Sequence, residues 1–519
     1  MKKLHIIFVL LVGIILLLGA CSSNESASNE ASTNSSDKSG GELIFGLAGD
    51  PGTMEAYTQN GTHGRTVKLA IFRGLYNYNA NGELEPELAE SYTSNDDLTS
   101  FTFKLRNAKF HNGDPVTAED VKYTFERILA SDSTATFKSS FAIIDNIKVD
   151  DDKTVTFNLK EPSNSFIHNV ALPESVIVSK SYTEENKDKV ATEPMGAGPY
   201  KLVSWNQGSN IVVEKFDDYY KKDKPYLDKI TFQFYSDENT RVNALRAGDV
   251  DIIETVPWKD AESLESTPGL KLSSTNGPFM ALQFNANSEP FKNPLVKQAI
   301  GYAIDRQAII NTAFSGRGEA LYGMPVHEGD SGYSEEVANY FEHNIQKAKE
   351  LLKEAGYPNG FSVKLLATSQ FGMHEQTAIA IQSELKKIGI KVELALPDWA
   401  TRGTMELKGD YDFLVVGSAG DIKDPDWLSP WFRKGNPSNY YNEEMQQLLD
   451  KGRKETDSIE REKIYNNLYT KILEESPYVY LTLREQNYGM KENIDGFTNI
   501  EGFLSFQSGY TLEDTYIKK

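Results

Sequence analysis

The sequence predicts a mixed α/β protein with more than one domain. The chain has 519 residues, which is more than one compact hydrophobic core normally organises, so two or three lobes are expected. An apolar content of 39% is enough to fill substantial cores. Between residues 361 and 418, strand and helix patterns alternate at the spacing of a parallel sheet with crossover helices.

The first half of the body reads as a mixture of strands and helices. A short strand is predicted at residues 41–46, and four later runs alternate apolar with polar residues, namely SFTFKL, TVTFNL, NIVVEKF and KITFQFY. The segment TAEDVKYTFERIL predicts a helix, because Thr117 can cap it and Val121, Phe125 and Ile128 share one face.

The second half has a clearer pattern. Asn293 and Pro294 predict the start of a helix, and residues 344–355 predict another that ends at Gly356. Strand, helix, strand, helix and strand then follow at FSVKLLAT, HEQTAIAIQSELKKI, IKVELAL, DWATRGTMELK and YDFLVVGS. Beyond them, KIYNNLYTKILEES predicts a helix, PYVYLTLREQNYGM a strand, and GFLSFQSGYTLEDTYIKK an irregular tail.

The loop GDIKDPDWLSPWF, residues 420–432, directly follows the last strand of this alternation. Ligands of parallel sheets bind beyond the carboxyl ends of the strands, so the loop is a candidate site. Its three acids lie beside two tryptophans, where burial is costly unless the charge is neutralised. A metal ion, a reacting substrate and a bound cation are the three alternatives.

The first residues resemble a bacterial lipoprotein signal. Lys2 and Lys3 precede an apolar run at residues 6–18, and Leu-Gly-Ala leads directly into Cys21, the only cysteine. This implies cleavage of residues 1–20 and lipidation of Cys21, with an ordinary secretory leader as the alternative. Residues 21–41 are rich in serine and predict a disordered tether that reaches roughly 25 Å. An exported protein anchored to the membrane is expected, because several acyl chains bind stably.

Charge and motifs narrow the function classes. A net charge of −21 argues against nucleic acid and against a surface that spreads on membranes, and it suits cationic ligands or simply a solvated acidic surface. Residues 329–332 read GDSG, but Tyr333 follows instead of the second glycine of a serine protease. The sequence contains no GxSxG, Walker or GxGxxG motif, and no histidine pair with HxxxH spacing. No cofactor is expected, although separated residues that hold a metal chelate stay open.

The acids of the loop do not follow a calcium-loop spacing. Asp421, Asp424 and Asp426 lack the one-three-five pattern and the glycine of an EF-hand.

Residues 88–129, which read LAESYTSNDDLTSFTFKLRNAKFHNGDPVTAEDVKYTFERIL, closely resemble the signature of the peptide/nickel-type (family 5) solute-binding proteins of ABC importers. The resemblance continues through GAGPYKLVSWNQGSNIVVEKFDDYY, TRVNALRAGDVDI, LVKQAIGYAIDRQAII, AKELLKEAGYPNGF, SELKKIGIKVEL and GDYDFLVVG. It covers the chain from Glu42 to the C-terminus.

The resemblance implies an α/β, two-lobed clamp of the periplasmic-binding-protein type (type II), with an extra subdomain in lobe one. Lobe one is expected at 42–87 and 193–285, the extra subdomain at 88–192, lobe two at 286–486, and a return to lobe one at 487–519. Connecting segments are expected near Gln283-Phe284 and Asn487-Tyr488.

The resemblance also implies site residues. Gly420 to Asp426 match the G-D-x-x-D-P-D context in which peptide-binding relatives place an aspartate against the ligand's α-ammonium, which makes Asp421 the ligand-binding acid. Asp424 and Asp426 are expected to shape the turn. Trp399 matches a tryptophan near the cleft.

Three further positions match a lobe-one segment that meets an extended peptide through its main chain, namely Asn60, Gly61 and Thr62. Trp427 is open to two interpretations, packing or ligand contact. Dipeptide binders hold the ligand carboxylate with an arginine early in the helix after the FSVKLLAT-type strand, and here that region reads SQFGMHEQTA. Arg402 is the candidate substitute, and a strict dipeptide preference is doubtful.

The resemblance therefore predicts a monomeric, lipid-anchored extracytoplasmic protein that captures di- to oligopeptides and performs no chemistry. Its partners would be a permease with its ATPase, and the membrane through Cys21. A nickel or metallophore complex is the alternative ligand, and a secreted peptidase is the alternative class.

Overall fold

The computed structural model describes residues 38, 40–58, 61–135, 137–434, 436 and 438–519. By its contacts the chain divides into residues 1–38 and residues 39–519, and the elements below belong to the second unit. The predicted leader and Cys21 lie outside the described residues, as does Asn60. In the described part, no helix combines the length and apolar character needed to cross a membrane.

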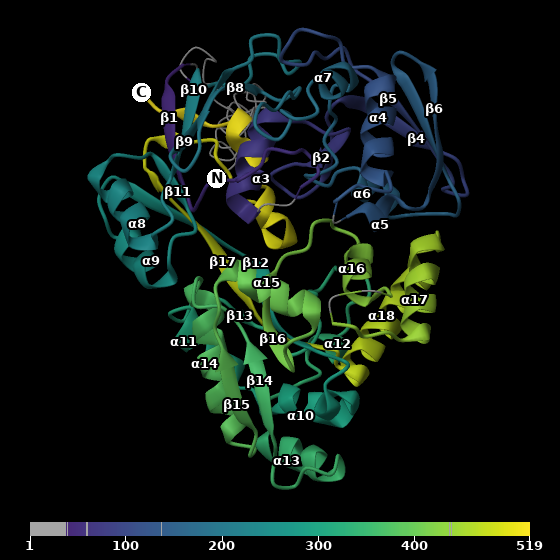
Figure 1. The fold of residues 1–519 in the computed structure, drawn as a ribbon, viewed down its shortest axis with the longest axis vertical. Coiled ribbons are helices and arrows are strands. Elements are labelled where there is room, and N and C mark those ends of the chain that lie inside the picture. The colour runs from purple at the N-terminus through teal and green to yellow at the C-terminus, as the bar shows by residue number, and fades with distance from the viewer. Residues whose placement is uncertain (1–37, 39, 59–60, 136, 435, 437) are drawn as a thin grey trace, which may run out of the picture. The chain divides into compact units, whose positions relative to one another are not determined.

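One long sheet runs through most of this unit, in the order β15-β14-β16-β12-β17-β11-β1-β10-β9-β8, with β13 paired to β17 (Figure 1). Its strands are β1 (Glu42–Leu47), β8 (Tyr200–Asn206), β9 (Asn210–Lys215), β10 (Lys229–Phe234), β11 (Ile252–Glu254), β12 (Leu270–Phe284), β13 (Glu319–Ala320), β14 (Ser362–Leu366), β15 (Lys391–Ala395), β16 (Phe413–Ser418) and β17 (Tyr478–Lys491). The other strands are β2 (Tyr76–Tyr78), β3 (Leu84–Pro86), β4 (Ala89–Ser94), β5 (Ser100–Leu105), β6 (Ile144–Asp151), β7 (Thr154–Leu159), β18 (Ile494–Asp495) and β19 (Tyr516–Ile517).

Helices cover both halves of the sheet. In the first half of the chain they are α3 (Gly61–Ile71), α4 (Ala118–Leu129), α5 (Lys138–Phe141), α6 (Phe166–Asn169), α7 (Lys180–Glu185), α8 (Glu238–Ala247) and α9 (Trp258–Glu265). In the second half they are η1 (Glu289–Lys292), α10 (Pro294–Ala303), α11 (Arg306–Ala313), α12 (Glu335–Ala338), α13 (Ile345–Glu354), α14 (Gly372–Lys386), α15 (Trp399–Lys408), η2 (Pro425–Leu428), α16 (Ser429–Phe432), α17 (Glu443–Lys454), α18 (Ser458–Glu475) and η3 (Gly502–Glu513).

The helix starts follow the predicted capping chemistry. Thr117 caps α4 through a capping box, because its hydroxyl accepts from the backbone of Asp120 while the Asp120 carboxylate accepts from the backbone of Thr117. Asn293 caps α10 ahead of Pro294. Both predicted helices are confirmed.

The parallel sheet predicted for the second half is confirmed. β14 pairs in parallel with β15 and with β16, and α14 packs on that side of the sheet. The apolar run of β16 is buried between β14 and β12, which explains why its sequence does not alternate. The loop that begins at residue 419 therefore leaves the carboxyl end of a central strand.

A separate four-stranded antiparallel sheet, β4-β5-β7-β6, lies in the first half of the chain. α4 packs against β6 and β7, and rings of Phe103, Phe125, Phe157 and Phe166 join their contact. This sheet falls within residues 88–192, which the sequence assigns to an extra subdomain.

Two long strands, β12 and β17, run side by side and pass from one half of the long sheet to the other (Figure 1). The later part of β12 pairs with β16 on its other edge, and the later part of β17 pairs with β11. Their register shifts between Asn276 and Phe279, where β12 contributes one extra residue. Gln283 and Asn487 both lie on this pair of strands, and the domain boundaries themselves stay predictions.

The predicted irregular tail is wrong over residues 502–513, which form the 3-10 helix η3. Hydroxyls stabilise its turns, since Ser508 donates to the carbonyl of Ser505 at 2.9 Å and Thr511 donates to that of Ser508 at 2.7 Å. η3 packs on α3 and β12 and is buried on almost all sides. A helix with three residues per turn and no solvent face leaves no 3.6-residue apolar period in the sequence.

Candidate ligand-binding site

Asp421 lies in the loop after β16, and its side chain is 33% exposed. The guanidinium of Arg65, on α3, donates from Nη1 to Asp421 Oδ1 at 2.9 Å. Gln507 of η3 donates to the carbonyl oxygen of Asp421 at 3.0 Å. Elements far apart in the sequence therefore hold this loop in place.

Arg65 joins two carboxylates. It is buried, and its Nε donates to Glu174 Oε1 at 2.9 Å. Burial alone would lower the pKa of Arg65, but the carboxylates of Glu174 and Asp421 raise it above its ordinary value. Burial raises the pKa of Glu174, and Arg65 opposes that rise. The counter-charge of Asp421 in this structure is thus a cation of the chain itself.

The other two acids of the loop are also paired. Asp424 accepts from the backbone of Asp426 at the start of η2 and pairs with Arg461 at 2.7 Å. Asp426 is buried and pairs with Arg453 at 2.8 Å. Both acids shape the loop, as the sequence predicted.

Trp399 and Arg402 lie on the first turn of α15, whose N-cap is Asp398. Trp399 is 42% exposed, and the Arg402 guanidinium lies 4.8 Å from the centre of its ring. Arg402 is buried and is already bonded, to Glu406 at 3.0 Å and to the carbonyl of Val415 at 2.9 Å. Arg402 is therefore not an uncompensated cation awaiting a ligand carboxylate.

Trp427 packs against other aromatic rings and also lines a cavity. Its side chain is 8% exposed, and its ring lies 5.8 Å from that of Phe279 and 5.1 Å from that of Phe503. Gly61 begins α3 with a φ of +74°, and the carbonyl of Thr62 accepts from the hydroxyl of Thr66. The main chain of Thr62 is thus used within α3.

A cavity of about 340 Å³ brings together four of the residues that the sequence selected, namely Trp399, Arg402, Asp421 and Trp427. Its wall also includes Ser140 and Asn169 from the first half of the chain and Ser418 at the end of β16. Polar donors beside aromatic surfaces are the usual lining of a small-molecule site. Gly61 and Thr62 are not among the described residues of this wall.

The same loop also lines a larger cavity of about 930 Å³. Ile422 and Trp427 belong to both cavities, and Asn276, His327 and Lys423 line the larger one. The loop after β16 therefore contributes to the walls of both cavities.

The described residues contain no group of three or more His, Cys, Asp or Glu side chains arranged to hold a metal ion. Sequence reasoning missed Arg65, which lies 356 residues from Asp421. Arg65 is flanked by Gly64 and Thr66, so no apolar pattern around it in the sequence signalled its burial.

Comparison with known proteins identifies the family. A sequence model of the "Bacterial extracellular solute-binding proteins, family 5 Middle" matches residues 83–440. The glutathione-binding protein GsiB of Pectobacterium atrosepticum is 31% identical over 460 residues, which cover 86% of this chain and 89% of that protein.

Solved structures agree. AgaA of A. tumefaciens R10, in complex with agropinic acid, is 53% identical, with a TM-score of 0.87 over 92% of this chain and 99% of that one. The Helicobacter pylori protein DppA, in complex with the peptide STSA, is 28% identical, with a TM-score of 0.84 over 93% of this chain and 99% of that one.

All three relatives are named as binding proteins, and DppA is described as associated with an ABC transporter. The chain therefore belongs to the family 5 extracellular solute-binding proteins of ABC importers, and it has their two-lobed α/β clamp.

Proposed function

We propose that this protein captures a small carboxylic acid derived from amino acids and delivers it to an ABC permease. It would act as a monomer outside the cytoplasm, held to the membrane by lipid on Cys21. Ligand binding would shift an equilibrium between open and closed clamps.

The pairing of Asp421 with Arg65 is the main observation in favour of an acid without a free ammonium as the ligand. An aspartate attracts a ligand ammonium most strongly when no cation of the chain already neutralises it, whereas this carboxylate bonds a guanidinium at 2.9 Å. A ligand without a free ammonium fits this site without breaking that pair. The structure that is 53% identical was solved with an acid, agropinic acid, in agreement with this proposal.

Short peptides with a free amino group are the second candidate. The Asp421 side chain is one-third exposed and lines the 340 Å³ cavity, so an ammonium can reach it. Relatives named for glutathione binding and a relative solved with a peptide support this candidate.

Calorimetry with a panel of ligands tests the proposal. Agropinic acid, glutathione, di- and tripeptides and nickel–histidine would each be titrated into the purified protein. We expect binding by an amino-acid-derived acid with a Kd of about 1 μM or below, worth about 8 kcal/mol. Binding of free-amine peptides alone, or of nickel–histidine alone, would contradict it.

Asp421→Asn separates the two candidates. For an acid that leaves the Arg65–Asp421 pair intact, we expect this variant to bind within about threefold of the wild type, because Asp421 makes no ligand contact. A free-amine peptide would lose about 30-fold or more, since a charge-assisted bond disappears. Calorimetric titration of the wild type and of Asp421→Asn, each with an acid and with a free-amine peptide, measures the difference in affinity.

Cys21→Ser is expected to release the protein from the membrane. Without the cysteine sulfur no thioether-linked lipid can form, and no other lipid anchor is proposed. Fractionation of cells that express each form, with incorporation of a labelled fatty acid, measures this. Retention of Cys21→Ser in the membrane fraction would show that Cys21 is not the anchor.

A further inference from the structure

Arg484 is a buried arginine that forms no ion pair with the described residues. It lies on β17, and 5% of its surface is exposed. Its Nε has no hydrogen-bond partner among the described residues, and no carboxylate of the described chain contributes to its pKa. Burial lowers the pKa of Arg484 to about 10, so the group keeps its charge at neutral pH.

The other buried arginines of the described chain have acceptors for their guanidinium groups. Each of them bonds carboxylates or backbone carbonyls, namely Arg65, Arg73, Arg241, Arg306, Arg402 and Arg453. Arg306 is the closest match, because it is 1% exposed and has no ion pair with the described residues, yet it donates to carbonyls of Gly301, Ile304 and Tyr480. Arg484 departs from this rule.

The nearest acid in the sequence does not compensate Arg484. Successive side chains of a strand point to opposite faces, so Glu485 lies on the other face of β17. There it pairs with Arg317 at 2.6 Å. The chain carries 75 acidic residues, but none of the described ones pairs with Arg484.

Polar groups gather on the face of β17 that carries Arg484. Thr482 and Gln486 are its neighbours at two-residue spacing, and Thr482 Oγ1 and Gln486 Nε2 are buried without a partner among the described residues. A buried polar atom without a partner costs about 1–3 kcal/mol, and such atoms are rare. With Arg484 Nε there are three such atoms on one strand face, and one of them belongs to a charged group. This is typical of a surface that a ligand completes.

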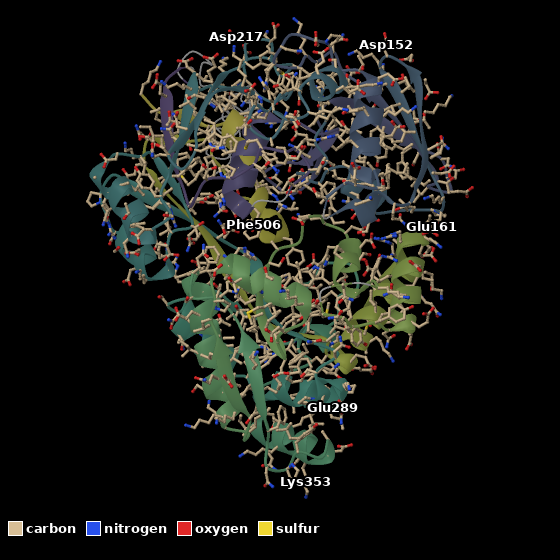
Figure 2. The ribbon with its side chains drawn as sticks, viewed as in Figure 1. Asp152, Glu161, Asp217, Glu289, Lys353 and Phe506 are labelled. Carbon is tan, nitrogen blue, oxygen red and sulfur yellow. The ribbon has the colours of Figure 1, made fainter. Side chains whose placement is uncertain are left out.

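Aromatic rings flank the guanidinium. The Arg484 Cζ atom lies 5.8 Å from the ring centre of Trp258 on α9 and 5.9 Å from that of Phe506 on η3 (Phe506 is labelled in Figure 2). Such contacts attract the cation but leave the N–H groups in the guanidinium plane without acceptors. An acceptor in that plane is still required.

Arg484 is not among the described residues that line the two cavities, but its charge acts on His374, which packs against Trp399 in the wall of the smaller one. The ring of His374 lies 5.5 Å from that of Trp399, and its pKa is lowered to about 3 by burial, then by Arg402 and by Arg484. His374 is therefore a neutral imidazole, and its Nδ1 is also without a partner among the described residues. β17 is one of the two long strands that pass from one half of the sheet to the other.

We propose that Arg484, with Thr482 and Gln486, binds the carboxylate of the imported solute. This deepens the proposed function and rests on it. A planar guanidinium matches a carboxylate with two parallel hydrogen bonds, and the neighbouring hydroxyl and amide supply further donors. The assignment differs from the sequence-based choice of Arg402, whose Nη atoms already bond Glu406 and Val415.

Arg484→Met, Arg484→Lys and the control Arg306→Met test the proposal in three measurements. The first is the melting temperature of ligand-stripped protein. The second is the shift of that temperature in sodium formate relative to sodium chloride at equal ionic strength. The third is calorimetric titration with agropinic acid.

Ligand-stripped Arg484→Met is expected to melt at or above the wild-type temperature, because an uncompensated buried charge is removed. Arg306→Met is expected to melt several degrees lower, because it strips acceptor carbonyls of their donor. Formate should raise the melting temperature of the wild type and not that of Arg484→Met. Agropinic acid should bind Arg484→Met about 100-fold more weakly and Arg484→Lys at an intermediate level, as for a truncated charge pair.

The outcomes separate the two proposals. A formate shift in the wild type that Arg484→Met abolishes supports the carboxylate site even if agropinic acid does not bind, in which case the ligand class is wrong. Arg484→Met that melts as low as Arg306→Met, with no formate shift in the wild type, would overturn the carboxylate site. Unchanged agropinic acid affinity in Arg484→Met would overturn it as well.

Discussion

Replacing Arg65 with methionine is expected to destabilise the protein by about 3–5 kcal/mol, as for a buried charge pair that loses one member. The carboxylate of Glu174, 3% exposed, would be left without its cation, whereas the Asp421 side chain can turn to solvent. Urea denaturation monitored by tryptophan fluorescence measures the change.

The stability loss of Arg65→Met should depend on pH, because it acts through the pKa of Glu174. Burial already raises the pKa of Glu174, and loss of Arg65 would raise it further. An acid whose pKa is higher in the folded state favours folding as pH falls, because the folded state binds the proton more tightly. The stability loss of Arg65→Met should therefore shrink as pH is lowered from 8 toward the ordinary range of glutamate.

Asp421→Asn is the matched control for Arg65→Met. It breaks the same ion pair at the partly exposed end, and we expect a cost of about 0–1 kcal/mol. Equal losses in the two variants would show that Glu174 is not the group that depends on Arg65.

Replacing Arg453 with methionine is the second large effect, again about 3–5 kcal/mol. Asp426 is buried and accepts three hydrogen bonds from Arg453, at 3.2, 3.0 and 2.8 Å, as well as one from the hydroxyl of Ser165 at 3.0 Å. Removing Arg453 leaves a buried carboxylate that two serine hydroxyls, of Ser165 and Ser429, only partly satisfy.

The same change should weaken ligand binding, because Asp426 lines the 340 Å³ cavity and fixes the loop that carries Asp421. Lys463→Met, which removes an exposed ion pair with Glu460 on α18, is expected to leave the unfolding midpoint unchanged. A midpoint for Arg453→Met that equals that of Lys463→Met would contradict the role of the Asp426 pair.

Local chemistry in the sequence was enough for most elements of the fold. The cap at Thr117, the Asn293-Pro294 start and the alternation through YDFLVVGS depend on neighbouring residues, and each appears in the structure as predicted. η3 was missed because its burial on nearly all sides removes the apolar stripe that identifies a helix.

The site was only partly predictable for a different reason. The loop at the end of β16 follows from the strand pattern, and it lines the cavity together with Trp399 and Arg402. The partners of its charges lie far away in sequence, on α3 for Asp421 and on α17 for Asp426. Arg484 stands out only once folding shows which arginines have partners.

Native mass spectrometry of the protein as purified tests the ligand class most directly, because closed clamps retain their ligands. We expect a bound species whose mass and fragmentation identify a small carboxylic acid derived from amino acids, and whose occupancy falls in Arg484→Met and persists in Asp421→Asn. A bound free-amine peptide that is lost in Asp421→Asn, or a species that contains nickel, would contradict the account.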